Sequence, residues 1–416
     1  MTALTGDVTV TGFGVRTAFG AGADALRRGV FAGVPSFAPT TRFDTGPYRT
    51  PMAGAAPDGA DAAEHRALRP ALAHCGREAL DMAGLPTGTQ AAVLLGIAGD
   101  CTGITRFWRE AAGPRGGAGP ADPEGGADAP ASNGNGDGDA VAQLADAVPA
   151  HLAESLAHSL GLTGPRLTFT NACVASAAAI IHACRLISSG RADVAVCAGG
   201  YLVEEETFGK FDSGRALSRD GLVRPFSADR TGLLLGDGVA AVVLESAEHA
   251  RRRGARPLAG VTGWGAATDA HHIAQPHPEG VGLARAARQA LRLAGDPDGA
   301  ALGYVNAHGT GTRYNDGAET RGLRAALGER AESVPVSSTK GTTGHLLEAA
   351  GVVEFVITVL ALMDGVLPPT ANLTRPDPEC DLDYVPNRPR QADLRRALTI
   401  NAAFGGANTA LVLERP

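Results

Sequence analysis

The chain changes from strand to helix at Thr170-Asn171-Ala172-Cys173-Val174-Ala175-Ser176-Ala177. The apolar run 167–169 predicts a short strand before this stretch, and the small-residue run 177–184 predicts a helix after it. Cys173 would then lie at a helix N-terminus, where free N–H groups and the helix dipole favour a thiolate and lower a cysteine pKa below its usual ~8.5. Cys173 is therefore a candidate nucleophile, with a buried structural cysteine as the alternative.

Two histidines follow at the ends of predicted short strands. His308 lies in the glycine- and threonine-rich loop 306–312, and His345 ends a similar loop at 337–345. Loops at strand ends commonly carry binding and catalytic groups on α/β scaffolds. Lys340, in the second loop, is one of only two lysines in a chain whose other cations are arginine. The pattern favours a functional ammonium there over a random surface lysine.

The last predicted element is a pair of apolar strands joined by the turn Asn401-Ala402-Ala403-Phe404-Gly405-Gly406-Ala407-Asn408. Its glycines allow the backbone to approach a ligand closely, and such a turn can present N–H groups to a developing oxyanion. An ordinary glycine-containing hairpin is the alternative interpretation.

In this order, Cys173, His308, Lys340, His345 and the terminal turn resemble the β-ketoacyl-acyl carrier protein synthases of the thiolase superfamily, specifically the elongating Cys-His-His class. The resemblance covers nearly the whole chain, and the stretch 366–386 is most similar to ketosynthases of type II polyketide systems. It implies a duplicated thiolase-like α/β fold, an α-β-α-β-α five-layered sandwich. The expected halves are residues 1–254 and 255–416.

The resemblance also implies a mechanism. Cys173 would take an acyl group from a carrier-protein thioester, and His308 and His345 would stabilise the enolate formed when a malonyl extender loses CO2. The resulting carbanion would attack the acyl-enzyme in a decarboxylative Claisen condensation. The backbone N–H groups of Cys173 and Phe404 would form the oxyanion hole.

Further site residues are carried over from the same family pattern. Lys340 would hold the loop network, with Glu319 as its acidic partner. Thr310 and Thr312 would touch the phosphopantetheine arm that carries the substrate, and Phe404 would gate the acyl pocket. No metal and no free cofactor are implied.

Internal repetition supports the duplication. The strand-then-glycine pattern of 8–14 recurs at 258–265, and the apolar runs 191–200 and 239–245 are typical of strands covered on both faces. Helical periodicity at 282–293 alternates with these strands, as in layered α/β folds.

Composition limits the remaining function classes. The 416 residues are 44% hydrophobic, enough for large buried sheets, and carry a net charge of −7, which argues against nucleic-acid binding. No apolar run reaches the ~20 residues of a membrane span and no secretion signal is apparent, so we expect a cytoplasmic protein that does not bind membranes. Six scattered cysteines without CxxC spacing indicate neither zinc nor disulfides. The Gly/Asp/Pro-rich insertion 111–140 is predicted to be a mobile loop.

The resemblance implies an acyl carrier protein as partner, and either a homodimer or a heterodimer with a chain-length-factor homologue. Two alternatives on the same fold are a non-decarboxylating acyltransferase, which could keep Cys173, and a non-catalytic chain-length-factor-like subunit, which would lack it. A thiolase would need a second cysteine in the terminal turn, and a papain-like hydrolase would not need Lys340. The sequence does not fix the length or reduction state of the acyl chain, the carrier-protein docking patch, or the pathway product.

Overall fold

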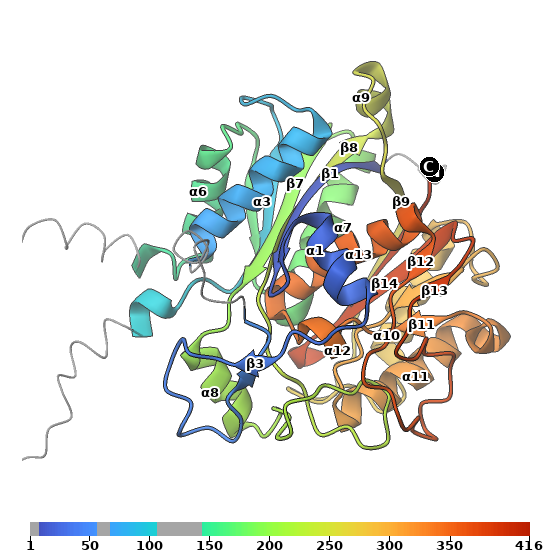
Figure 1. Ribbon diagram of the computed structural model, residues 1–416. Coiled ribbons are helices and arrows are strands. Elements are labelled where there is room, and N and C mark those ends of the chain that lie inside the picture. The colour runs from blue at the N-terminus through green and yellow to red at the C-terminus, as the bar shows by residue number, and fades with distance from the viewer. Residues whose placement is uncertain (1–7, 56–66, 106–143) are drawn as a thin grey trace, which may run out of the picture.

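The computed structural model describes residues 8–55, 67–105 and 144–416. The predicted mobile insertion 111–140 lies outside these ranges. The described part is built on one mixed sheet with the strand order β11-β10-β14-β15-β9-β1-β8-β7-β5-β6 (Figure 1).

The two ends of this sheet have the same topology. The first half has the order β1-β8-β7-β5-β6 and comprises β1 (Val8–Thr17), β5 (Ala92–Gly96), β6 (Arg166–Phe169), β7 (Val194–Tyr201) and β8 (Gly238–Ser246). The second half has the order β9-β15-β14-β10-β11 and comprises β9 (Ala259–Thr268), β10 (Tyr304–Asn306), β11 (Val336–Ser337), β14 (Arg396–Ala402) and β15 (Ala407–Glu414). When the five strands of each half are numbered in chain order, both halves have the spatial order 1-5-4-2-3. In each half the first two pairings are antiparallel and the last two are parallel.

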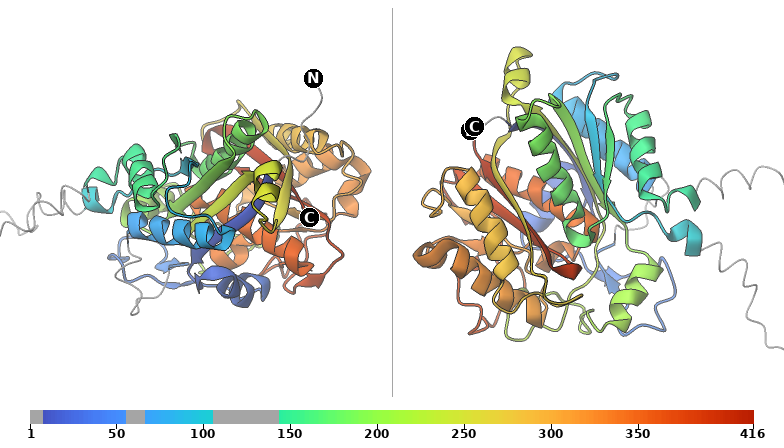
Figure 2. Two further views of the ribbon diagram at one scale, coloured as in Figure 1. Left: turned by 90° about the horizontal axis from the view of Figure 1, so that it is seen from above. Right: turned by 180° about the vertical axis from the view of Figure 1, so that it is seen from behind.

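Helices cover the sheet in layers (Figures 1 and 2). The outer helices of the first half are α3 (Leu68–Ala83) and α6 (Pro149–Ser159), those of the second half are α10 (Val281–Leu293) and α11 (Arg313–Leu327), and α7 (Ala175–Ser188) and α13 (Ala350–Asp364) pack together between the halves. The result is the α-β-α-β-α sandwich, so the predicted duplicated fold is confirmed. The halves join where β1 and β9 pair, at Val8–Val10 against Ala259–Val261.

The repeated glycines have a structural reason. A side-chain carbon on Gly12 would lie 2.1 Å from the Ala79 carbonyl oxygen of α3, and one on Gly265 would lie 2.0 Å from the Ala286 carbonyl oxygen of α10. In each half, the first strand therefore meets its covering helix at backbone distance, which only glycine allows.

Shorter elements complete the described chain: β2 (Gly20–Ala21), α1 (Gly22–Leu26), the π-helical turn η1 (Arg27–Phe31), β3 (Ala38–Pro39), β4 (Met52–Ala53), the 3₁₀ turn η2 (Ala172–Val174), α8 (Glu205–Ser213), α9 (Ala247–Arg252), η3 (Gly328–Glu332), α12 (Lys340–Thr343), η4 (Leu347–Ala349), β12 (Val366–Leu367), β13 (Arg390–Gln391) and η5 (Phe404–Gly406). None of the helices in the described ranges is long and apolar enough to cross a membrane.

Candidate active site

The candidate nucleophile lies at the carboxyl end of β6. Cys173 occupies the 3₁₀ turn η2, directly before α7, and its side chain is buried. The preceding residue, Ala172, has φ +53°, a left-handed conformation that a residue with a side chain adopts at a cost. The sharp turn from strand into helix places the sulfur at the helix start, as the sequence predicts.

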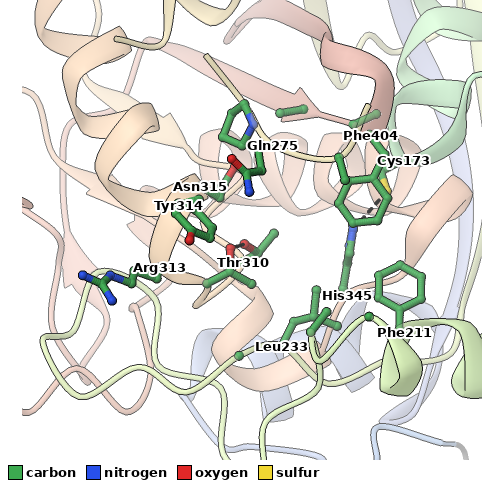
Figure 3. A pocket seen from close by; sticks show the side chains of 18 of the residues that line it. Cys173, Phe211, Leu233, Gln275, Thr310, Arg313, Tyr314, Asn315, His345 and Phe404 are labelled. Atoms are coloured by element: carbon green, nitrogen blue, oxygen red, sulfur yellow. Dashed lines mark hydrogen bonds between the residues drawn. The ribbon is translucent and has the colours of Figure 1, made fainter. Parts of the chain in front are cut away.

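Both candidate histidines lie in the same buried region. His345 Nε2 is 3.1 Å from Cys173 Sγ (Figure 3). The His308 ring stands edge-on to the His345 ring, with 5.3 Å between the ring centroids. The loops after β10 and β11, far apart in sequence from the nucleophile, therefore bring their histidines to one place.

The sequence predicts a lowered pKa and a thiolate for Cys173, and this prediction is wrong. Burial raises the pKa of Cys173 to about 12, with the carboxyl group of Glu348 adding to the shift. Desolvation, followed by the nearby Lys340 ammonium, holds the pKa values of His308 and His345 well below their usual range. Burial therefore favours a thiol beside a neutral imidazole in the resting pair.

Lys340 is fully buried, and its ion-pair partner differs from the expected one. Lys340 Nζ bonds to Glu354 Oε1 of α13, and Asn401 Nδ2 donates to Glu354 Oε2 at 2.6 Å. Glu354 thus ties the Lys340 loop to the terminal turn. Apart from the last residue of α13, Glu354 is the one charged residue of this mainly apolar helix. That pattern could have identified Glu354 from the sequence.

Glu319 was predicted to be the acidic partner of Lys340, but it binds backbone groups instead. Its two carboxylate oxygens accept hydrogen bonds from the backbone N–H groups of His308 and Gly309, each at 2.7 Å. Burial raises the pKa of Glu319 to about 7, against the lowering effect of the Gly309 hydrogen bond. Glu319 therefore fixes the backbone of the His308 loop.

A pocket of about 510 Å³ leads from the surface to Cys173 and His345 (Figure 3). Thr310 and Thr312 line it, with their hydroxyl oxygens 2.8 Å apart. Phe404 also lines it; its side chain is 52% exposed and stacks on Phe211 with 5.8 Å between ring centroids. Of the predicted site residues, Cys173, Thr310, Thr312, His345 and Phe404 line this cavity, whereas His308, Glu319 and Lys340 do not.

Residues 8–55, 67–105 and 144–416 contain few side chains that could bind a metal ion together. One group of side chains there is close enough to hold an ion: Cys101, Glu204 and Glu206, whose candidate ligand atoms lie within 4.8 Å of one another. None of these belongs to the site around Cys173.

The chain is similar to known proteins over most of its length. Residues 5–250 match the family model described as beta-ketoacyl synthase, N-terminal domain, and residues 258–374 match the C-terminal domain model. The tetracenomycin polyketide synthase ketoacyl synthase alpha subunit of Streptomyces glaucescens is 37% identical over 434 residues, covering 98% of this chain and 97% of the relative. The 3-oxoacyl-[acyl-carrier-protein] synthase 2 of Synechocystis sp. is 42% identical over 274 residues, covering 64% of this chain and 65% of the relative.

Solved structures agree with these matches. The ishigamide ketosynthase/chain length factor superposes with a TM-score of 0.85 at 31% identity, covering 99% of this chain and 100% of that one. A type II polyketide ketosynthase in complex with its acyl-carrier protein and bound to the hexaketide, AntDE:AntF, also has a TM-score of 0.85, at 25% identity and with the same coverage. With both family models matched and a full-length relative above 30% identity, the chain belongs to the β-ketoacyl synthase family.

Proposed function

We propose that this protein is a ketosynthase that condenses an acyl group on Cys173 with malonyl-acyl carrier protein, releasing CO2, in type II polyketide or specialised fatty-acid biosynthesis. The observation that carries the proposal is the contact of 3.1 Å between Cys173 Sγ and His345 Nε2 at the inner end of the pocket, with His308 beside it.

The first half-reaction is acyl transfer. Cys173 Sγ attacks the thioester carbonyl of the acyl-carrier protein, and a carbon–sulfur bond to the enzyme forms while the bond to the phosphopantetheine sulfur breaks. Because the resting cysteine is a thiol, its proton has to leave during the attack. His345 Nε2 is placed to accept this proton and return it to the departing phosphopantetheine sulfur.

The second half-reaction is condensation. Malonyl thioester loses CO2, and the electron pair of the broken carbon–carbon bond forms an enolate. A neutral imidazole at His308 can donate an N–H hydrogen bond to the enolate oxygen, and His345 can do so in its Nε2–H tautomer, so His345 changes tautomer between the two half-reactions. The enolate carbon then attacks the Cys173 thioester and forms the 3-ketoacyl product on the carrier protein. The cysteine sulfur leaves as a thiolate, which takes up one proton from solvent to restore the resting thiol.

The remaining residues position these groups. Lys340 and Glu354 hold the two C-terminal loops together, and Glu319 holds the His308 loop. Thr310 and Thr312 lie along the pocket as contacts for the phosphopantetheine arm, and Phe404 is its gate. The N–H groups of Cys173 and Phe404 are the proposed oxyanion hole.

Partners and organisation form part of the proposal. Similar solved structures hold a ketosynthase with its chain length factor or with an acyl-carrier protein, which supports the same partners here. No free cofactor is required, since the substrates arrive on the phosphopantetheine arm. Halves 1–254 and 255–416, and a cytoplasmic location, complete the proposed organisation.

The decisive test uses Cys173→Gln and matched histidine variants. Cys173→Gln should lose acyl loading, read by intact mass, but keep decarboxylation of malonyl-carrier protein, because glutamine occupies the place of an acylated cysteine. His308→Ala should lower decarboxylation by ~10²–10³, the usual cost of losing one preorganised donor. Wild-type protein that loads acyl groups without releasing CO2 would instead identify a non-decarboxylating acyltransferase.

A further inference from the structure

The outer end of the pocket is formed in part by the loop between β9 and α10, residues 269–280, which we call the mouth loop. Four residues of this loop line the pocket: Asp269, Ala274, Gln275 and Pro276. Ala274 and Gln275 are exposed, and Gln275 can be seen beside the cavity in Figure 3. The phosphopantetheine arm of the proposed reaction has to pass this loop to reach Cys173.

The mouth loop also holds the terminal turn in place. The Gly405 N–H donates to the Ile273 carbonyl oxygen at 2.7 Å. The Asp269 N–H donates to the Gly406 carbonyl oxygen at 2.8 Å. Because this turn carries Phe404, which lines the same pocket, the conformation of the mouth loop affects two parts of the pocket wall.

Two histidines of the mouth loop accept hydrogen bonds from its own backbone. His272 Nδ1 accepts from the N–H groups of Ala274 and Gln275, at 3.0 and 3.1 Å. His277 Nδ1 accepts from the Glu279 N–H at 3.2 Å. An imidazole nitrogen accepts a hydrogen bond only while it is unprotonated, so both rings have to be neutral for these three bonds to form.

A third histidine adds a charge effect. The rings of His271 and His277 are in contact, with 5.0 Å between their centroids. A proton on each of these rings would place two positive charges side by side. Protonation at Nδ1 of His272 or His277 would also turn an acceptor into a donor that faces other donors. Acid therefore disfavours this conformation of the loop.

The other charged groups at the mouth loop are carboxylates and guanidinium groups. The Asp269 carboxylate accepts the backbone N–H of His277 at 2.9 Å. The guanidinium of Arg321, on α11, lies 3.7 Å from the Glu279 carboxylate and 3.9 Å from that of Glu379. The arginines that line the pocket are Arg215, Arg230 and Arg313. As classes, carboxyl groups change charge near pH ~4 and guanidinium groups above ~12, whereas imidazoles do so between about pH 5 and 8.

On the basis of the ketosynthase function proposed above, we propose that His272 and His277 are positioning residues whose neutral rings hold the mouth loop in the form that binds the phosphopantetheine arm, so that binding of the arm weakens as the pH falls. The two rings act through the loop backbone and do not touch the reacting atoms. The ordered loop binds fewer protons than the opened loop. Its stability is therefore highest above the pH range in which imidazoles titrate and decreases as the pH falls through that range.

The test measures loading of Cys173 by octanoyl-pantetheine, followed by intact mass of the full-length protein at about pH 8 and about pH 5.5. Pantetheine thioesters carry no group that titrates in this range, so a change in the apparent KM comes from the protein. We expect the KM to rise about tenfold or more at the lower pH, because the three hydrogen bonds of the loop are lost. The KM is decisive because the maximal rate also reflects proton transfer from Cys173. An equal KM at both pH values would overturn the proposal.

Asparagine variants keep a hydrogen-bond acceptor that cannot be protonated in this range. The side-chain oxygen of asparagine accepts nearby backbone N–H groups in turns, as these Nδ1 atoms do. His272→Asn combined with His277→Asn should therefore keep a low KM at both pH values. His272→Ala combined with His277→Ala should have a high KM at both. His158→Asn, at an exposed position of α6, is the matched control and should retain the pH dependence of the wild type.

Glu319 is the rival source of a pH effect on binding of the arm. Burial raises the pKa of Glu319 to about 7, and its carboxylate holds the backbone of the His308 loop. Glu319 is unchanged in the double asparagine variant. A rise in KM at low pH that persists in that variant would assign the effect to Glu319 and overturn the proposal.

Hydrogen exchange tests the mouth loop without catalysis, and it needs only the wild-type protein if the variants do not fold. After correction for the intrinsic pH dependence of exchange, peptides that cover residues 269–280 should lose protection between about pH 8 and about pH 5.5, whereas peptides of α6 should not. Unchanged protection of the mouth loop would overturn the proposal.

The two measurements separate this proposal from the underlying function. Wild-type protein that neither loads octanoyl groups nor decarboxylates malonyl-carrier protein would refute the ketosynthase function itself. Normal loading and decarboxylation, with a KM and a loop protection that do not depend on pH, would refute the role of His272 and His277 alone.

Discussion

Cys173 and His345 face each other as two neutral groups because burial disfavours charge on both. The thiolate–imidazolium alternative would place two charges in a region where Cys173 and His345 are each almost fully buried. Nucleophile activation is therefore coupled to the attack on the substrate instead of being stored in a resting thiolate.

Alkylation of Cys173 should follow this charge state. With a pKa of about 12, the thiolate fraction rises roughly tenfold for each pH unit through neutrality and beyond. The rate of iodoacetamide labelling of Cys173, mapped by peptide mass, should therefore increase steadily from pH 6 to pH 9. A plateau reached near pH 7 would show that the helix dipole does lower the pKa.

Removing one charge of the buried Lys340–Glu354 pair should lower the unfolding free energy more than removing both charges. Glu354→Gln leaves the Lys340 ammonium buried without a counter-charge, which typically costs ~3–5 kcal/mol of unfolding free energy. Adding Lys340→Met should recover much of that loss, since the unpaired charge is gone. Chemical denaturation of both variants measures the difference, and equal stability of the two would show that the pair is not coupled.

At the residue scale, the sequence predicts which side chains meet but not how they pair. Cys173, His308 and His345 carry recognisable loop patterns. The partner of Lys340 does not, because Glu354 comes from a helix whose contacts are set by packing between the halves of the sheet.

At the scale of elements, helix packing on β1 and β9 depends on contacts with no intervening side chain. Gly265→Ala would place a carbon 2.0 Å from the Ala286 carbonyl oxygen of α10, so strand and helix would have to move apart. We expect a loss of several kcal/mol or failure to fold. Gly260→Ala, in the same strand, is the control, because its nearest neighbour would be 3.9 Å away. Similar unfolding midpoints for the two variants would contradict this account.

Element positions were predictable to within a few residues where periodicity was strong. The helix expected at 282–293 runs from Val281 to Leu293, and the strand expected at 191–200 begins at Val194. The order of strands in the sheet was not readable from the sequence, because it depends on pairings between segments far apart in the chain. The family resemblance implied the layered, duplicated arrangement, and the strand order itself was not predicted.

At the scale of the whole molecule, the two edges of the sheet differ. The edge strand β11 is buried, and the Val336 N–H donates to the Asp383 carbonyl oxygen. The other edge strand, β6, is partly exposed along its length, including Leu167 and Phe169. An exposed, partly apolar edge strand invites pairing with another chain. Partner identity depends on such surfaces, which is why the sequence leaves it open.

We therefore expect dimerisation through β6, with a second copy or a chain-length-factor homologue. Val93 N–H donates to the Pro165 carbonyl and Ile97 N–H to the Phe169 carbonyl, so alternate residues of β6 face β5, and Thr168 faces away. Thr168→Pro removes an outward donor without removing a bond to β5, and it should convert the dimer to monomer in light scattering. Thr168→Val, which keeps the donor, should stay dimeric. Because Cys173 lies five residues beyond Thr168, the monomer should also lose condensation activity. A Thr168→Pro protein that remains dimeric and active would place the interface elsewhere.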